Sequence, residues 1–456
     1  MNVEQHNSKL MLPSSLRFTN MANWQLLGMK AFGLLLFCQV WVEMGSLTLR
    51  AEDVVVLLLV SGIILSTLVH LKVRYRWSRF HAPLLLLIGI FLLGSLVTQI
   101  RPFPAQIKQD ALINSLRLIL AVSMFFVTYR LPVSPLKVTQ KIMQIVGVAS
   151  VVTTIVALLQ IAYWAGLSIP LPIWLTQLKE GANQAQGREI FALFVGDTGT
   201  HVWSAMLSFQ AIVVWVWATH TKHHIYRVAG FSYFLLLFFI LVRVSVRNSL
   251  LGLVVSISCL MLLRIKRSPY PINRILKPML FAVAIILVIA FLFLIAPDNY
   301  FVDRIRQVIP QWDRGTFVLD RGSNIFGRMR YAVFAWTLFI KYPLWGGGFW
   351  SYSTFAKNMV DLQIAHAHNS YLQVMAELGV LGALSFSWLI WRIIRFLKQA
   401  GRQLHNNFWF QQHWYMTTGA LIFMGFTAMF ANPFWQPKQV AFSMILLAVM
   451  VRHMQI

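Results

Sequence analysis

The sequence HAHNSYLQVMAELGVLG, residues 366–382, places two histidines directly before a long apolar run. Ser370 with Gln373 three residues later is a capping-box pattern, which predicts that a helix begins at Ser370. The apolar run continues to about Leu397, which is long enough for a helix to cross a membrane. The pattern therefore predicts that His368 lies at the mouth of a membrane helix.

A second stretch, GRMRYAVFAWTLFIKYPLWGGGFWSY at 327–352, precedes the first one. Arg328 and Arg330 stand at the head of its apolar segment. The segment stops at Pro343 and at a triple-glycine turn, residues 346–348, because proline cannot continue a helix and glycine favours turns. The two stretches together predict a cationic site and a histidine close to the membrane surface.

The composition identifies a membrane protein. Hydrophobic residues make up 58% of the 456 residues and charged residues only 12%. A soluble domain of this length could not cover so much apolar surface with so few charges, so the chain is predicted to be polytopic. Cys38 and Cys259 lie inside apolar runs without metal-ligand spacing, which argues against a disulfide framework and against a cysteine-based metal site.

Apolar runs of roughly 17 to 25 residues predict an all-α fold with about twelve transmembrane helices. The runs lie near 25–44, 53–71, 83–99, 111–129, 142–167, 198–219, 228–244, 246–264, 278–296, 371–397, 413–432 and 437–453. The predicted organisation is a cytoplasmic tail at 1–24, helices one to nine within 25–296, a loop at 297–370, and helices ten to twelve with a short tail within 371–456.

The basic residues orient these helices. Clusters such as KVRYRWSR at 72–79 and RIKRSPYPINRILK at 264–277 fall in even-numbered connections, which the positive-inside rule places in the cytoplasm. The net charge of +25 therefore reports topology and contact with anionic membrane lipids, not nucleic acid. The 74-residue loop at 297–370 is then outside, and we expect short helices there that cover an outer cavity.

Several charged groups share the predicted outer side. The arginines are Arg117, Arg188, Arg247, Arg328 and Arg330. A guanidinium near hydrocarbon requires a partner, and its planar fork suits phosphate oxygens. The alternative is that single arginines pair with acids such as Asp110 or Glu189.

Two further residues are candidates for chemistry near the start of the run at 371–397. His368 is a candidate general base or phosphate hydrogen-bond donor, with a water-satisfied interfacial residue as the alternative. Glu377 lies seven residues into the run, where an ionisable group is a functional candidate or a structural ion-pair partner. His366 with Asp361 is a weak metal-binding pattern, so we expect no metal.

The order of three motifs resembles the O-antigen ligase and O-antigen polymerase superfamily. They are SVRNSLLG at 245–252, the arginine stretch at 327–352 and the histidine stretch at 366–382. The resemblance implies a bacterial inner-membrane glycosyltransferase that uses glycans carried on undecaprenyl diphosphate. It also implies that Arg247 and Arg328 hold the diphosphate and that His368 is catalytic. Arg188 fits a looser arginine pattern of the family.

The implied reaction is displacement at the anomeric carbon with inversion, on the periplasmic face, without a cofactor or a metal. The acceptor is a second glycan in O-antigen or exopolysaccharide polymerisation, or lipid A core in ligation. The long loop favours polymerisation, because it could guide a growing lipid-linked chain. Two other classes remain: a twelve-helix secondary transporter using Arg117 and Glu377, and a scaffold whose loop binds a protein partner. The sequence shows no matching halves, which argues against a transporter.

Overall fold

The computed structural model describes four main segments, 77–164, 200–266, 324–360 and 366–455, apart from 132, 245–246 and 404–407. It also describes two short hairpins and scattered residues between 31 and 61. The helices are α3 (His81–Ile100), α4 (Ala105–Tyr129), α5 (Pro135–Trp164), α7 (Thr200–His220), α8 (His224–Val244), α9 (Arg247–Lys266), α12 (Asn324–Lys341), α13 (Tyr352–Val360), α14 (Ser370–Arg402), α15 (Phe408–Thr427) and α16 (Pro437–His453), with a 3₁₀ turn η2 (Pro433–Trp435).

Nine of the twelve predicted spans coincide with described helices. Seven of these, α3, α4, α5, α7, α8, α9 and α14, are long and apolar enough to cross a membrane. The predicted spans at 278–296 and over most of 53–71 and 25–44 lie outside the described residues. The prediction of a multi-pass helical membrane protein is therefore confirmed, whereas the number of twelve spans and the side of each loop stay predictions.

Two short hairpins accompany the helices of this predominantly helical fold. Strand β1 (Trp41–Met44) pairs antiparallel with β2 (Leu47–Arg50), so the end of the predicted span at 25–44 is extended and not helical. The residues between these strands are Gly45 and Ser46, which are types that two-residue hairpin turns favour. A second hairpin, β3 (Gln311–Asp313) with β4 (Thr316–Val318), lies within the predicted loop.

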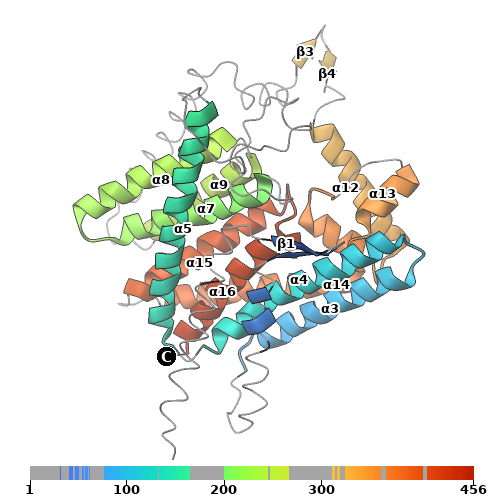
Figure 1. Ribbon diagram of the computed structural model, residues 1–456, viewed down its shortest axis with the longest axis horizontal. Coiled ribbons are helices and arrows are strands. Elements are labelled where there is room, and N and C mark those ends of the chain that lie inside the picture. The colour runs from blue at the N-terminus through green and yellow to red at the C-terminus, as the bar shows by residue number, and fades with distance from the viewer. Residues whose placement is uncertain are drawn as a thin grey trace, which may run out of the picture.

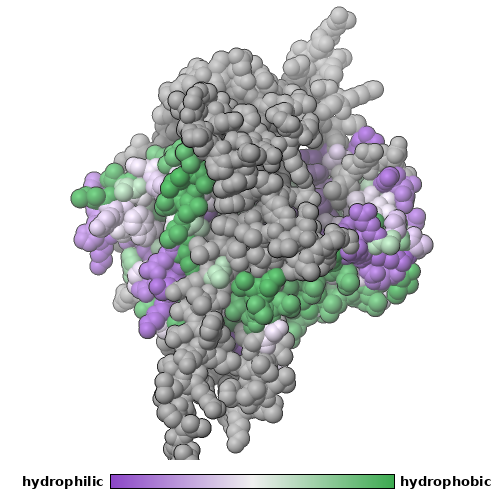
Figure 2. Space-filling view, in the orientation of Figure 1, coloured by the Kyte–Doolittle hydropathy of each residue, from purple (hydrophilic) through white to green (hydrophobic). Residues whose placement is uncertain are grey.

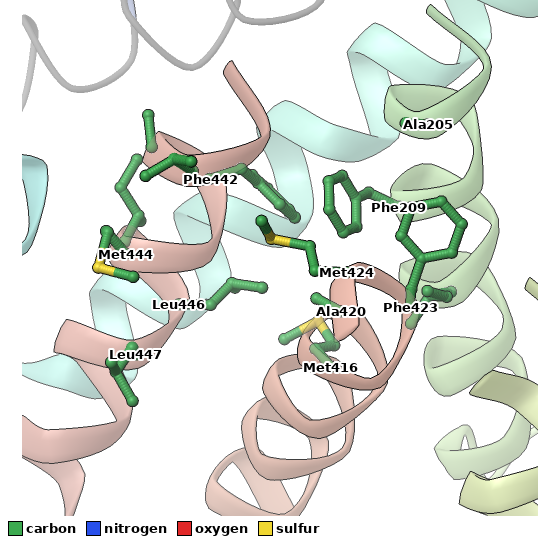
Figure 3. Close-up of a cluster of buried hydrophobic side chains, with 14 of the residues drawn as sticks. Ala205, Phe209, Met416, Ala420, Phe423, Met424, Phe442, Met444, Leu446 and Leu447 are labelled. Carbon is green, nitrogen blue, oxygen red and sulfur yellow. The ribbon is translucent and has the colours of Figure 1, made fainter. Parts of the chain in front are cut away.

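The core lies between helices that are distant in the sequence (Figure 1). Helix α16 packs on α4, α15 packs on α9, and α14 packs on both α3 and α12. Figure 3 shows the apolar centre between α7, α15 and α16, where the Phe209 ring lies 5.2 Å from that of Phe423 and 5.1 Å from that of Phe442. Figure 2 shows a hydrophobic band over α3 and α4, as expected of helices that face lipid.

The expected short helices within 297–370 are present as α12 and α13. They lie together at the right of Figure 1, beside one end of α3 and α4. Between them, the glycine turn at 346–348 enters the bundle and contacts α3 and α14. This end of the bundle, where α14 begins, holds the predicted site.

Candidate functional site

Helix α14 is interrupted at Gly379. The backbone of Gly379 has φ 65° and ψ −159°, a conformation that only glycine adopts readily. Helical hydrogen bonding is therefore broken there, which leaves carbonyl and amide groups that need other partners. Inside a membrane protein such groups must be satisfied by protein, because hydrocarbon offers none.

The glycine turn supplies those partners. The amides of Gly347 and Gly348 donate to the carbonyls of Ala376 and Glu377, at 2.8 and 3.0 Å. In return, the amide of Val380 donates to the carbonyl of Pro343 at 2.8 Å. The two irregular segments thus exchange backbone hydrogen bonds, and each supplies partners for backbone groups of the other.

Close approach explains why these positions are glycine. Gly346 and Gly348 also have positive φ, of 70° and 105°. A side chain on Gly346 would meet the backbone of Glu377, and one on Gly379 would meet the carbonyl of Leu344. The turn is held from the other side by α3, where the hydroxyl of Thr98 donates to the carbonyl of Phe349 at 2.7 Å.

The Glu377 carboxylate is the polar centre of this region and is 1% exposed. It accepts hydrogen bonds from the amides of Trp350 and Tyr352, at 3.1 and 3.2 Å. It also accepts from the indole of Trp435 at 3.0 Å and from the side-chain amide of Gln373 at 3.2 Å. Glu377 therefore joins the segment after the glycine turn, helix α14 and η2, and these four partners are neutral donors.

The cap of α14 differs from the prediction. Asn369, and not Ser370, is the N-cap residue: its backbone is extended and its side-chain oxygen accepts from the amide of Leu372 at 3.0 Å. Gln373 does not close a capping box, because its side-chain oxygen accepts from the amides of Ala367 and the Asn432 side chain. The tertiary contacts of Gln373 outweigh the local pattern, and the helix still begins at Ser370.

His368 lies directly before this cap in a left-handed backbone conformation, φ 51°. Its ring stacks on that of Tyr331 in α12, with centroids 5.6 Å apart and planes at 29°. The carbonyl of Tyr331 accepts a hydrogen bond from the Tyr352 hydroxyl at 2.9 Å, which fixes this part of α12. Tyr331 thus positions the His368 imidazole, a role that sequence reasoning missed because nothing local pairs residues 37 positions apart.

Arg328 lies three residues before Tyr331 in α12. It is half-buried, and burial lowers the pKa of its guanidinium while the nearby Tyr331 acts in the opposite direction. Tyr331 is therefore close enough to influence the Arg328 guanidinium, and its ring stacks on that of His368. Arg330, two residues after Arg328, is exposed. A cation and an imidazole near one tyrosine form a site that can bind an anion beside a proton acceptor.

Arg247 opens α9 at the same end of the bundle. The next residue, Asn248, donates to the carbonyl of Phe430 at 2.9 Å. Ser370 binds the same turn, since its amide donates to Ala428 and its hydroxyl to Ala431. The first turns of α9 and α14 therefore attach to one connection, residues 428–431. The side chain of Arg247 lies outside the described part of the structure.

The four remaining residues predicted from the sequence are Arg117, Arg188, Asp361 and His366. Arg117 lies in α4 close enough to Asp110 for the two charges to interact, which agrees with the alternative that it pairs with an acid. Arg188 and Asp361 lie outside the described residues. The His366 ring makes an edge contact with Trp350 at 5.6 Å. Among the described residues, no group of three or more His, Cys, Asp or Glu is placed to hold a metal ion.

Arg101, after the end of α3, is a further charged residue that the sequence did not single out. Its guanidinium lies 3.9 Å from the ring centroid of Tyr342 and donates to the carbonyl of Gly346 at 3.2 Å. It therefore covers the glycine turn from the side of α3. The sequence around Arg101, RPFP at 101–104, does not predict this contact, because Tyr342 and Gly346 lie more than 200 residues further along the chain.

Comparison with protein families identifies the segment that carries this site. Residues 232–387 match the family model described as O-antigen ligase, and no curated protein matches the chain. The match spans about a third of the chain and contains Arg247, Arg328, His368 and Glu377. It confirms the resemblance to the O-antigen ligase and polymerase superfamily, and it indicates glycosyl transfer of the ligase or polymerase type, with a lipid-linked glycan and an acceptor as substrates.

Proposed function

We propose, with the O-antigen ligase and polymerase superfamily as the premise, that this chain moves a glycan from undecaprenyl diphosphate to an acceptor hydroxyl. We place the reaction on the periplasmic face of the bacterial inner membrane, in polymerisation of O-antigen or exopolysaccharide. The observation that supports this most is that His368 stacks on Tyr331, which also lies close enough to Arg328 to influence its charge, inside the matched segment.

The arginines act on the leaving group. When the bond between the anomeric carbon and the phosphate oxygen breaks, its electron pair goes to the diphosphate, which gains negative charge. Fixed cations placed where that charge develops stabilise the transition state more than the ground state. We assign this role to Arg328 and Arg247, with Arg330 and Arg188 as further contacts to the donor.

His368 acts on the acceptor. We assign it the role of general base, in which the neutral imidazole accepts the proton of the acceptor hydroxyl. The acceptor oxygen then forms the new bond on the face opposite the leaving diphosphate, which inverts the anomeric configuration. Glu377 is assigned a positioning role, because its carboxylate holds the backbone beside this site and is itself buried.

The test is transfer by the full-length protein in liposomes that contain a glycan on undecaprenyl diphosphate. His368→Ala and Arg328→Lys should each lower the rate about 100-fold, since lysine keeps the charge but loses the planar donor fork. The matched control is Arg395→Lys, at the far end of α14 over Trp391, which should keep the rate. Full activity of Arg328→Lys would contradict the anion role.

Metal removal tests the same assignment. The arginines supply the positive charge that a divalent cation would otherwise supply, so activity should persist in excess EDTA. Activity that is lost in EDTA and restored by magnesium or manganese would contradict the metal-independent mechanism.

Ligation to lipid A core is the second candidate, and the description of the matched family model favours it. Both reactions use one donor and one acceptor hydroxyl, so the proposed catalytic residues serve either of them. Deletion of the gene followed by mass spectrometry of lipid-linked glycans distinguishes them. Loss of a polymerase leaves single repeat units, whereas loss of a ligase leaves long polymer on undecaprenyl diphosphate.

A further inference from the structure

Helix α12 has two apolar faces. One face is buried in the protein: Phe334, Ala335 and Leu338 are at most 5% exposed and belong to a cluster that includes Ala376 of α14. The opposite face carries Met329, Val333, Trp336 and Ile340, which are 61%, 64%, 49% and 61% exposed. We call these four residues the α12 stripe. An apolar row of this kind, outside a protein core, requires an apolar partner.

The α12 stripe is narrow and continuous. Its spacings of four, three and four residues place the four side chains within about 60° of the helix circumference, over a length of about 16 Å. An amphipathic helix that packs against a broad surface usually shows an apolar face of about 100° or more. Helix α12 is not among the described helices that are apolar enough to cross a membrane. The stripe is therefore narrower than the apolar face of a helix that lies on the membrane surface, and its width suits one extended chain or the seam of a second helix. The charges beside the stripe decide between these two occupants.

Two cations flank the first residue of the α12 stripe, and a third follows its last residue. Arg328 and Arg330 directly precede and follow Met329, and Lys341 directly follows Ile340. A ligand that lies on the stripe with its polar end at Met329 would therefore place that end beside two guanidinium groups, which suit phosphate oxygens. Charge and apolar surface are thus joined on one helix, in the order in which a diphosphate is joined to a single hydrocarbon chain.

We propose that the α12 stripe binds the isoprenoid tail of the diphosphate donor, with the tail running from Arg328 toward Ile340. This inference rests on the proposed function, because it takes the diphosphate to be bound at Arg328. The tail gains burial of apolar surface along the helix, because the four stripe side chains are exposed while Glu377 is buried. Binding energy from the tail would then hold the reacting end in place.

The first experiment measures binding without activity. The full-length protein in nanodiscs of phosphatidylethanolamine and phosphatidylglycerol is irradiated with a polyprenyl diphosphate that carries a diazirine in its tail, and the adducts are mapped by mass spectrometry. Adducts are expected at 329–340, and unlabelled polyprenyl diphosphate should abolish them whereas added phosphatidylglycerol should not. Adducts spread evenly over lipid-facing helices, or removed by phosphatidylglycerol, would show that ordinary lipid covers the stripe and would overturn the proposal.

The second experiment measures transfer by Val333→Ser/Ile340→Ser. The KM for a donor with a long tail should rise at least tenfold with little change in kcat, while the KM for the same glycan diphosphate on a short tail should stay unchanged. The matched control is Leu92→Ser/Leu96→Ser in α3, where both residues are 55% exposed, and it should leave both KM values unchanged. Equal KM values for the stripe variant and the wild type would overturn the proposal.

The two experiments separate the possible failures. Specific adducts at the α12 stripe without transfer by the wild type would contradict the proposed function and still support the tail site. Transfer by the wild type without specific adducts at the stripe would contradict the tail site and still support the proposed function.

Discussion

Two buried regions of this protein are stabilised in opposite ways. Between α7, α15 and α16, rings and methionines such as Phe209, Phe423 and Met416 fill space without specific hydrogen bonds between them (Figure 3). At the break in α14, the same depth of burial is reached by Glu377, Gly379 and the glycine turn, through hydrogen bonds. The stability of the first region depends on side-chain volume, so it tolerates exchange of one apolar side chain for another of similar shape. The stability of the second region depends on particular hydrogen-bonding atoms.

The difference also separates packing from function. The apolar cluster contains none of the predicted site residues, whereas Glu377 at the break in α14 is linked through Tyr352 to Tyr331, on whose ring His368 stacks. An irregular backbone within a membrane bundle is tolerated only where protein satisfies it, and it is commonly found where helices surround a binding site. We therefore expect substitutions at the break to affect both stability and activity.

The largest effect is expected from Glu377→Leu, which leaves four buried or part-buried donors without their acceptor. Each such donor costs about 1–3 kcal/mol, so little folded protein should be recovered. Glu377→Gln keeps one acceptor oxygen and should give folded protein with a lower melting temperature. The measurement is fluorescence-detected size exclusion with a thermal ramp in detergent.

Met416→Leu is the matched change in the apolar cluster, since Met416 is fully buried there. It should cost less than about 1.5 kcal/mol, because the two side chains have similar volumes. Equal melting temperatures for Glu377→Leu and Met416→Leu would contradict the conclusion that the two regions are stabilised in different ways.

A smaller effect is expected from Gly379→Ala. Alanine is strained at φ 65° and its Cβ would meet the carbonyl of Leu344, so the break and the glycine turn must separate. Strain of this kind costs about 1–3 kcal/mol. Gly89→Ala in α3 is the control: no atom lies within 4 Å of the added Cβ, and alanine favours a helix, so stability should be kept or increased. Thermal unfolding that ranks these variants in the reverse order would contradict the structure at Gly379.

The smallest effect is expected at Tyr331. Tyr331→Leu removes the ring that stacks on His368, and an aromatic pair contributes about 0.5–1.5 kcal/mol, so kcat should fall about tenfold with little change in KM or melting temperature. Tyr331→Phe keeps the ring and should restore kcat. A Tyr331→Phe variant as impaired as Tyr331→Leu would assign the effect to the hydroxyl and would reject the positioning role of the ring.

The sequence predicted the helices well because each span carries its own signal. A run such as 83–99 must be apolar along its whole length to cross a bilayer, and α3 covers it within two residues at either end. Helix α12 was visible in the same way, from the apolar segment that Pro343 ends. The cap was predicted at the wrong residue, because Asn369 and Ser370 are both good capping types and only distant contacts chose between them.

The sequence by itself determined that this is a multi-pass helical membrane protein and which arginines and histidine to examine, because hydropathy and residue type are local properties. Only the tertiary structure decided that Gly379 interrupts α14, that the glycine turn completes the broken hydrogen bonds, and that Glu377 holds both. It also stacked His368 on Tyr331, close to Arg328 in α12. The physical reason is that hydrogen-bond partners and stacked rings are selected by geometry between segments, and the spacing of residues along one chain does not contain that geometry.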